Sequence, residues 1–212
     1  FLNKQQHLTV RRHGDTLVAS TNFGRERRVI LAGHLDTVPV IDNFPPRWLE
    51  PGDPLIREDV AAGHEQERVL WGRGATDMKG SDAVMLYLAA TLTDAKYDLT
   101  YVFYDHEEVA AEKNGLRKVV EAHPDWISGD FAIIGEPTDC GIEGGCNGTM
   151  RFDVITHGIA AHSARAWMGK NAIHAAAEIL NRLNAYENRA IEVDGLTYQE
   201  GLNATLISGG KG

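Results

Sequence analysis

Long apolar segments are missing from this chain. No run approaches the roughly 20 residues that a helix needs to cross a bilayer. The opening residues, FLNKQQHLTV, do not resemble a secretory signal and do not begin with Met. We therefore predict a protein with no membrane partner, and we expect its N-terminal end to be truncated.

Cysteine and positive charge are also scarce. The two cysteines, Cys140 and Cys146, have a spacing unlike that of a zinc ribbon or a redox pair. We therefore expect free thiols in a reducing cytoplasm and no disulfide framework. Lys and Arg number 21 against 30 Asp and Glu, which gives a net charge of −9. Because phosphate binding needs a basic face, this balance argues against a nucleic-acid partner.

The signals of a nucleophilic hydrolase are absent as well. Ser163 follows His162 directly but lacks the Gly-x-Ser-x-Gly turn of serine hydrolases, and neither cysteine has an evident partner. The chain has 212 residues, 43% of them hydrophobic. This length is enough to bury a substantial core in one large domain or two small ones.

The most distinctive stretch is the glycine-rich run from Trp71 to Gly80, centred on Asp77. Gly72 and Gly74 allow backbone conformations that are closed to other residues. The segment from Ser81 to Leu92 is predicted to form a buried helix that holds this turn in place. A carboxylate presented in this way suits a bridge between metal ions, because each oxygen can bind one cation. The alternative is that Asp77 caps the helix that follows.

A predicted strand from Arg28 to Gly33 leads into His34 and Asp36. The strand is a nearly continuous apolar run, which is typical of a strand covered on both faces. Residues two apart in an extended chain share a face, so Asp36 can support the His34 imidazole. Carboxylates do this behind metal-ligating histidines. A purely structural hydrogen bond between the two side chains is the alternative.

Two further predicted strands end in acids. Leu99 to Tyr104 leads into Glu107 and Glu108, and Phe131 to Ile134 is followed by Glu136. Adjacent glutamates repel each other and need compensating positive charge, which a divalent cation would supply, as would solvent around an exposed turn. The carboxyl ends of parallel strands are where α/β sheets place their sites. We therefore expect these acids to gather with His34 and Asp77 around metal ions.

The other segments are read from their periodicity. Val40 to Glu67 is rich in Pro, Gly and acids and is predicted to be a surface loop. Thr149 to Thr156 and Leu202 to Ile207 are predicted strands. Asn171 to Leu183 is predicted to be an amphipathic helix with one apolar face. A strand, a helix and further strands indicate a small α+β domain in the last third of the chain.

Five motifs, in this order, resemble the M20 family of metallopeptidases and deacylases: GHLDTVP, GRGATDMKG, the DHEE turn, GEPTD, and GIAAHSAR followed by NAIHAAAEI. The resemblance implies an α/β zinc-hydrolase catalytic domain with a mixed, mostly parallel sheet between helices, here residues 1–147. It also implies a smaller α+β, ferredoxin-like lid and dimerisation domain, here residues 148–212. Family members continue further and return to the catalytic domain with a last zinc-ligating histidine. We therefore expect this chain to be truncated at both ends.

The resemblance also implies a site for two Zn²⁺ ions, which Co²⁺ could replace. By position, His34 and Glu136 would bind one zinc and Glu108 the other, while Asp77 would bridge them. Asp36 would interact with the His34 imidazole without binding a metal itself.

Further roles follow from the same resemblance. Glu107 would be the general base that takes a proton from the water between the metals. His162 would reach the site of the partner subunit and stabilise the tetrahedral oxyanion. Asn147 and Thr149 would contact the carboxylate end of the substrate. The family also implies a cis peptide bond between Asp77 and Met78.

Within the family, the segment HSARAWMGKNAIH is most similar to actinobacterial enzymes that remove succinate from N-succinyl-LL-2,6-diaminopimelate. The resemblance therefore implies a cytoplasmic, homodimeric amide hydrolase of lysine and diaminopimelate biosynthesis, acting on a small N-acyl amino acid. The alternatives are another member of the family (an acetylornithine deacetylase, an aminoacylase or a carboxypeptidase) and an inactive metal-binding or interaction fragment.

Overall fold

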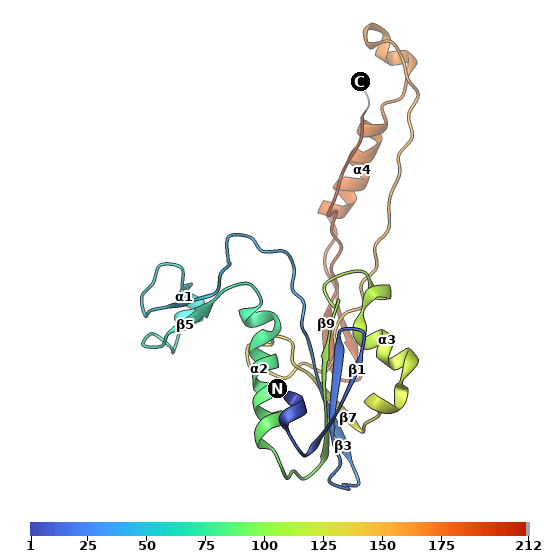
Figure 1. Ribbon diagram of the computed structural model, residues 1–212. Coiled ribbons are helices and arrows are strands. Elements are labelled where there is room, and N and C mark those ends of the chain that lie inside the picture. The colour runs from blue at the N-terminus through green and yellow to red at the C-terminus, as the bar shows by residue number, and fades with distance from the viewer. Residues whose placement is uncertain (211–212) are drawn as a thin grey trace. The chain divides into compact units, whose positions relative to one another are not determined.

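The computed structural model describes residues 1–210, with the backbone alone at residues 60 and 61. The chain divides into two compact units, Phe1–Cys140 and Gly141–Gly212. The first unit is built on a five-stranded sheet (Figure 1). In spatial order its strands are β1 (Leu8–His13), β2 (Thr16–Thr21), β6 (Asp98–Tyr104), β3 (Arg28–His34) and β7 (Phe131–Ile134).

The sheet is mixed, as predicted, but it is not mostly parallel. The β1–β2 and β2–β6 pairs are antiparallel, and the β6–β3 and β3–β7 pairs are parallel. A two-residue turn at Gly14 and Asp15, with Gly14 at φ +59°, makes a hairpin of β1 and β2. Such a turn joins only antiparallel strands. The β1–β2 hairpin and the antiparallel β2–β6 pair make half of the strand pairs antiparallel, so the mostly parallel sheet that the resemblance implies is wrong.

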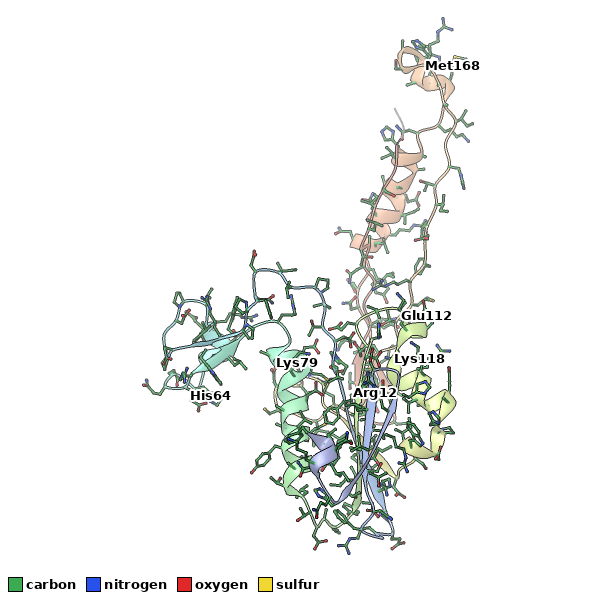
Figure 2. All side chains as sticks on the ribbon, in the orientation of Figure 1. Arg12, His64, Lys79, Glu112, Lys118 and Met168 are labelled. Carbon is green, nitrogen blue, oxygen red and sulfur yellow. The ribbon has the colours of Figure 1, made fainter. Side chains whose placement is uncertain are left out.

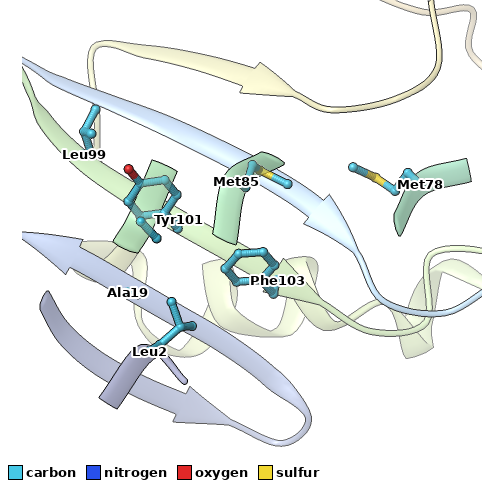
Figure 3. Close-up of a cluster of buried hydrophobic side chains, with 8 residues drawn as sticks. Leu2, Ala19, Met78, Met85, Leu99, Tyr101 and Phe103 are labelled. Atoms are coloured by element: carbon cyan, nitrogen blue, oxygen red, sulfur yellow. The ribbon is translucent and has the colours of Figure 1, made fainter. Parts of the chain in front are cut away.

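Helices cover both faces of this sheet, with α2 (Gly80–Thr91) on one side and α3 (Gly115–Ala122) on the other (Figure 1). β6 serves both faces because its side chains alternate. Tyr101 and Phe103 pack with Met85 of α2 (Figure 3), whereas Val102 packs with Val119 of α3. The expectation that the strand from Arg28 to Gly33 is covered on both faces is confirmed, because Val29 and Leu31 of β3 pack on the α2 side and Ile30 and Ala32 on the α3 side. Three further short helices of this unit are η1 (Leu2–Lys4), η3 (Ala111–Lys113) and η4 (Pro124–Ile127).

The three parallel strands end at the same edge of the sheet. In the β3–β6 ladder His34 lies opposite Tyr104, and in the β3–β7 ladder Ala32 lies opposite Ile134. The segments that follow β3, β6 and β7 therefore leave the sheet side by side. This arrangement places the predicted metal ligands in one region.

The segment from Val40 to Glu67 is more ordered than the predicted loop. It contains β4 (Arg47–Leu49), which pairs with β5 (Val69–Trp71), and the short helix α1 (Glu58–Ala61) (Figure 1). Strands of three residues are too short to show a period of two, so the sequence pattern missed them. His64 lies on this segment and is exposed (Figure 2).

The second unit contains η5 (Ser163–Met168), α4 (Ala172–Asn184) and a hairpin of β8 (Ala190–Val193) and β9 (Leu196–Gln199). The predicted helix is confirmed. The predicted strands over 149–156 and 202–207 are wrong, because in neither segment does the described backbone form a ladder with another strand. Alternating side chains favour a strand only where a partner supplies the hydrogen bonds. The division after Cys140 lies near the predicted domain boundary, and the roles of the two domains stay predictions.

The expectation of free cysteines agrees with the structure. Cys140 and Cys146 are both exposed and free. Within residues 1–210, no helix is long and apolar enough to cross a membrane.

Asp98, at the start of β6, holds the turn between β2 and β3. Its side chain is 4% exposed. It accepts hydrogen bonds from the Phe23 N–H (2.6 Å), the Arg25 N–H (2.9 Å) and the Thr21 hydroxyl (2.9 Å). Burial by itself raises the pKa of Asp98, but these hydrogen bonds outweigh it and hold the pKa below its usual value.

Replacing Asp98 by Ala is expected to lower the free energy of unfolding by about 3 kcal/mol, because three donors lose a buried, charged acceptor. The pKa of Asp98 is lower in the folded than in the unfolded chain. Its contribution is therefore complete above about pH 4 and is lost as the pH falls through the folded-state value. Urea unfolding of both proteins across this pH range measures the effect.

The matched control is Asp94→Ala, which removes an exposed carboxylate paired with Arg25. Exposed ion pairs contribute less than about 1 kcal/mol. Equal losses in the two variants would contradict the role of Asp98.

Candidate metal centre

His34, the last residue of β3, lies at the centre of a group of acids. Its side chain is 1% exposed. Its Nε2 lies 2.9 Å from Asp77 Oδ1 and 3.8 Å from Glu136 Oε2. Its Nδ1 lies 3.0 Å from the main-chain oxygen of Asp36. A carbonyl oxygen only accepts, so Nδ1 carries a proton, and the hydrogen bond to Asp77 requires a second proton on Nε2. When the imidazole is neutral, Nδ1 keeps its proton and the lone pair of Nε2 faces the acids. This is the tautomer that a metal ligand needs.

Three of the predicted ligands form one compact group. His34, Asp77 and Glu108 each offer a ligand atom, and these atoms all lie within 4.8 Å of one another. Imidazole nitrogen and carboxylate oxygens are ligands that Zn²⁺ accepts in proteins. Glu136 lies at the edge of this group, next to the imidazole.

The charges of the group fit a divalent cation. Burial and the negative charge of Asp77 raise the pKa of Glu108 above its usual value. Burial likewise raises the pKa of Glu136, with added repulsion from Asp77. Burial alone would lower the pKa of His34, but the hydrogen bond with Asp77 outweighs it and the pKa lies above its usual value. The acids thus lack compensating positive charge, which a bound cation supplies.

Asp77 is presented by a turn with little freedom. It lies in η2 (Ala75–Lys79), after Gly74, whose φ of +78° is in the left-handed region. A side chain at Gly74 would also put its Cβ 2.8 Å from the Thr37 methyl group. The Asp77–Met78 peptide bond is cis, as the resemblance implies. Met78 is fully buried and its sulfur accepts the His34 N–H, while the Asp77 side chain is half-exposed.

Asp36 supports the group in a way that the sequence did not indicate. Its carboxylate accepts the N–H of Glu107 (3.0 Å) and the N–H of Glu108 (3.1 Å). The carboxylate lies 3.7 Å from His34 Nδ1, and the closer contact with the imidazole is through the main-chain oxygen. Asp36 therefore ties the segment after β3 to the segment after β6.

The acids after β6 have different surroundings. Asp105 accepts the Thr16 hydroxyl at 2.6 Å and pairs with His106, so its carboxylate is already occupied. Glu107 is half-buried, and its charge raises the pKa of Glu108 and Glu136. Glu107 and Glu108, the pair that the sequence singled out, thus both contribute negative charge to the cluster.

Two groups near the site were missed. Asp82, in the first turn of α2, is 5% exposed, and neither carboxylate oxygen has a partner among the described residues. Burial raises its pKa to about 6. Tyr104 is buried with its ring edge toward His34. Asp82 could have been found as the single acid of an otherwise apolar segment, whereas nothing in the strand pattern marks Tyr104.

A cavity of ≈200 Å³ opens beside the cluster. Asp77 and Glu108 line it together with Thr37, Thr76 and Arg73. Its lining is therefore mostly polar, and it gives a small molecule access to the predicted ligands.

The other predicted site residues belong to the second unit. His162 Nδ1 accepts the N–H of Ala164 at 3.1 Å, which leaves Nε2–H of the neutral ring as an exposed donor. The Asn147 amide donates to the main-chain oxygen of Gln199 at 2.7 Å. Thr149 is exposed. The roles of these three residues stay predictions.

Several known proteins are similar to this chain in sequence. A protein of Mycobacterium tuberculosis named as the succinyl-diaminopimelate desuccinylase DapE is 47% identical over 199 residues, covering 94% of this chain and 51% of its own. The succinyl-diaminopimelate desuccinylase of Corynebacterium glutamicum is 43% identical over 202 residues, covering 94% and 50%. The chain thus spans about half the length of the curated relatives it matches.

One solved structure with a similar fold is an M20 family metallo-carboxypeptidase from Sulfolobus solfataricus. It has 17% identity and a TM-score of 0.41, over 60% of this chain and 28% of that one, a likeness too distant to add to the assignment. The family model for Peptidase family M20/M25/M40 matches residues 30–200. That range contains every predicted metal ligand. The chain therefore belongs to peptidase family M20/M25/M40, a family of metal-dependent hydrolases.

Proposed function

We propose that this chain carries the catalytic centre of an amide hydrolase that removes succinate from N-succinyl-LL-2,6-diaminopimelate, in the biosynthesis of diaminopimelate and lysine. The observation that carries the proposal is the group formed by His34, Asp77 and Glu108 at the edge of the sheet. The two relatives named for this reaction, at 47% and 43% identity, support the choice of substrate.

Two Zn²⁺ ions, or Co²⁺ in their place, fit the ligands of this site. His34 and Glu136 would hold one ion, Glu108 the other, and Asp77 would bridge them. The closeness of His34 Nε2 to Asp77 (2.9 Å) and to Glu136 (3.8 Å) supports this division. Bound zinc supplies Lewis acidity, which polarises the amide carbonyl and lowers the pKa of water.

Glu107 is the general base in this proposal. Its N–H is held by the Asp36 carboxylate, so its backbone is fixed while its side chain stays free to accept a proton. It takes a proton from the attacking water and delivers it to the leaving amine. Its position next to Glu108 supports this role.

His162 donates to the developing oxyanion from the partner subunit. Its exposed Nε2–H is the required kind of donor, and oxyanion stabilisation is a large term in acyl transfer. Residues 141–210 contain no buried residue, and the apolar Ile173 and Leu180 of α4 are exposed. An unburied apolar face of this kind supports dimerisation through the second unit. Asn147 and Thr149 contact a substrate carboxylate.

The substrate assignment predicts a preference that can be measured. The zinc-loaded full-length protein is expected to hydrolyse N-succinyl-diaminopimelate at least about 100-fold more efficiently (kcat/KM) than N-acetylornithine, N-acetyl amino acids or dipeptides, because a site built for the succinyl group rejects acyl groups that leave its polar groups unpaired. Chelation should remove the activity, and zinc should restore it. Faster hydrolysis of another compound in this panel would show that that compound is the substrate. Hydrolysis of none of them would contradict the proposal that the protein is an enzyme.

Replacing Glu107 by Gln is expected to lower kcat by at least about 100-fold, because the amide cannot accept the proton. Zinc content should stay at that of the wild type, because Glu107 is not a proposed ligand. The control is Asp105→Asn, whose carboxylate is bound by Thr16 and His106. It should keep both zinc and turnover. Normal turnover by Glu107→Gln would exclude this residue as the base.

The proposed crossing of His162 between subunits predicts that two inactive variants rescue each other. Glu107→Gln and His162→Ala, refolded together, place an intact Glu107 and an intact His162 in one site of each mixed dimer. Half of the dimers would be mixed, each with one working site, so about a quarter of wild-type activity should return. Glu107→Gln mixed with Asp77→Ala is the control and should stay inactive. No rescue by His162→Ala would place this histidine in its own subunit's site.

A further inference from the structure

Arg73 is the cationic residue that lines the cavity beside two of the proposed metal ligands, Asp77 and Glu108. The cavity is lined by Arg73, Thr37 and Thr76 together with the acids Asp77 and Glu108. If the two acids bind metal, the groups left to recognise a ligand are a guanidinium and two hydroxyls. These are donors that suit a carboxylate.

The backbone holds Arg73 in a defined place. Its N–H donates to the main-chain oxygen of Asn43 at 2.8 Å. A side chain at Gly72 would put its Cβ 2.7 Å from Pro46, and one at Gly74 would lie 2.8 Å from Thr37. Close packing therefore requires glycine on both sides of Arg73, and this packing fixes the backbone from which the arginine side chain extends.

The guanidinium of Arg73 has no protein partner in the described part of the chain. Its Nε is buried without a hydrogen bond, and no carboxylate forms an ion pair with it within 4.0 Å. The Thr37 and Thr76 hydroxyls are likewise without hydrogen bonds among these residues. Nε is closed off from the cavity, so the two terminal nitrogens of the guanidinium, which also have no partner among the described residues, are the donors left for a ligand. Donors without partners beside a cavity indicate a ligand that satisfies them.

We propose that Arg73 is a substrate-binding residue, whose guanidinium pairs with a carboxylate of the substrate in the cavity beside Asp77 and Glu108. The inference rests on the proposed function, because N-succinyl-diaminopimelate carries carboxylates on both sides of its scissile amide. Arginine is suited to this role because its planar fork pairs with both oxygens of a carboxylate, which lysine cannot do.

The test uses the zinc-loaded full-length protein and the variants Arg73→Met and Arg73→Lys. Succinate and diaminopimelate are titrated separately by calorimetry, and zinc content is measured on each sample. Arg73→Met is expected to weaken the binding of at least one of the two probes by about 10- to 100-fold with zinc unchanged. Arg73→Lys should restore little of it. The control, Arg117→Lys on the exposed face of α3, should bind both probes normally.

The two probes locate the carboxylate. Weaker succinate binding assigns it to the acyl group, and weaker diaminopimelate binding assigns it to the amine product. In turnover, the matching result is a rise in KM for N-succinyl-diaminopimelate with kcat changed by less than about 3-fold.

Three results would overturn the inference. Unchanged binding of both probes would show that Arg73 does not contact the ligand. Parallel loss of zinc would make Arg73 a structural support of the metal site. Full rescue by Lys would reduce its role to charge alone. Calorimetry measures binding without turnover, so the two proposals can fail independently. A wild-type protein that binds the probes but does not hydrolyse N-succinyl-diaminopimelate would contradict the proposed reaction alone.

Discussion

The site depends on the balance of charge around His34. A buried imidazole is surrounded by the carboxylates of Asp77, Glu108 and Glu136. Burial disfavours the charged forms of His34, Glu108 and Glu136. The hydrogen bond between His34 and Asp77 relieves only part of the repulsion. The acids stay close because packing holds the segments that carry them. The fold therefore stabilises an arrangement that its side chains alone would oppose, and a divalent cation is the simplest compensation.

The packing that holds these segments comes from the two hydrophobic clusters on the faces of the sheet. Residues of β6 contribute to both, since Tyr101 and Phe103 face α2 while Val102 faces α3. Met78 joins the α2 cluster one residue after Asp77, which anchors the turn in the core and leaves the acid at the surface. The predicted metal ligands thus lie close to a core that fixes the backbones of the segments that carry them.

Hydrogen bonds then arrange the segments after the strands. The Asp36 carboxylate binds the main-chain N–H groups of Glu107 and Glu108, so their side chains remain available. The same residue orients His34 through its carbonyl oxygen. One aspartate therefore sets the tautomer of the imidazole and the position of the glutamate pair. Supporting contacts of this kind commonly determine how well a metal site performs.

The amino-acid sequence determined which residues are available for chemistry. Three features could be predicted because strand propensity and glycine turns are local properties of the sequence. They are an apolar strand that ends in His34, a glycine turn around Asp77, and acids after two further strands. Family membership followed from the same motifs. The helix of the second unit was also predictable, because the Asn171 cap and a period of 3.6 lie within one segment.

Only the tertiary structure decided which partners these residues have. That Asp36 binds two main-chain groups 71 and 72 residues away, that Asp105 is occupied by Thr16, and that Asp82 is buried without a partner are long-range contacts. The same holds for the antiparallel half of the sheet and for the segments of the second unit that lack a ladder. Strand pairing and burial depend on neighbours distant in sequence, and a local pattern contains no information about them.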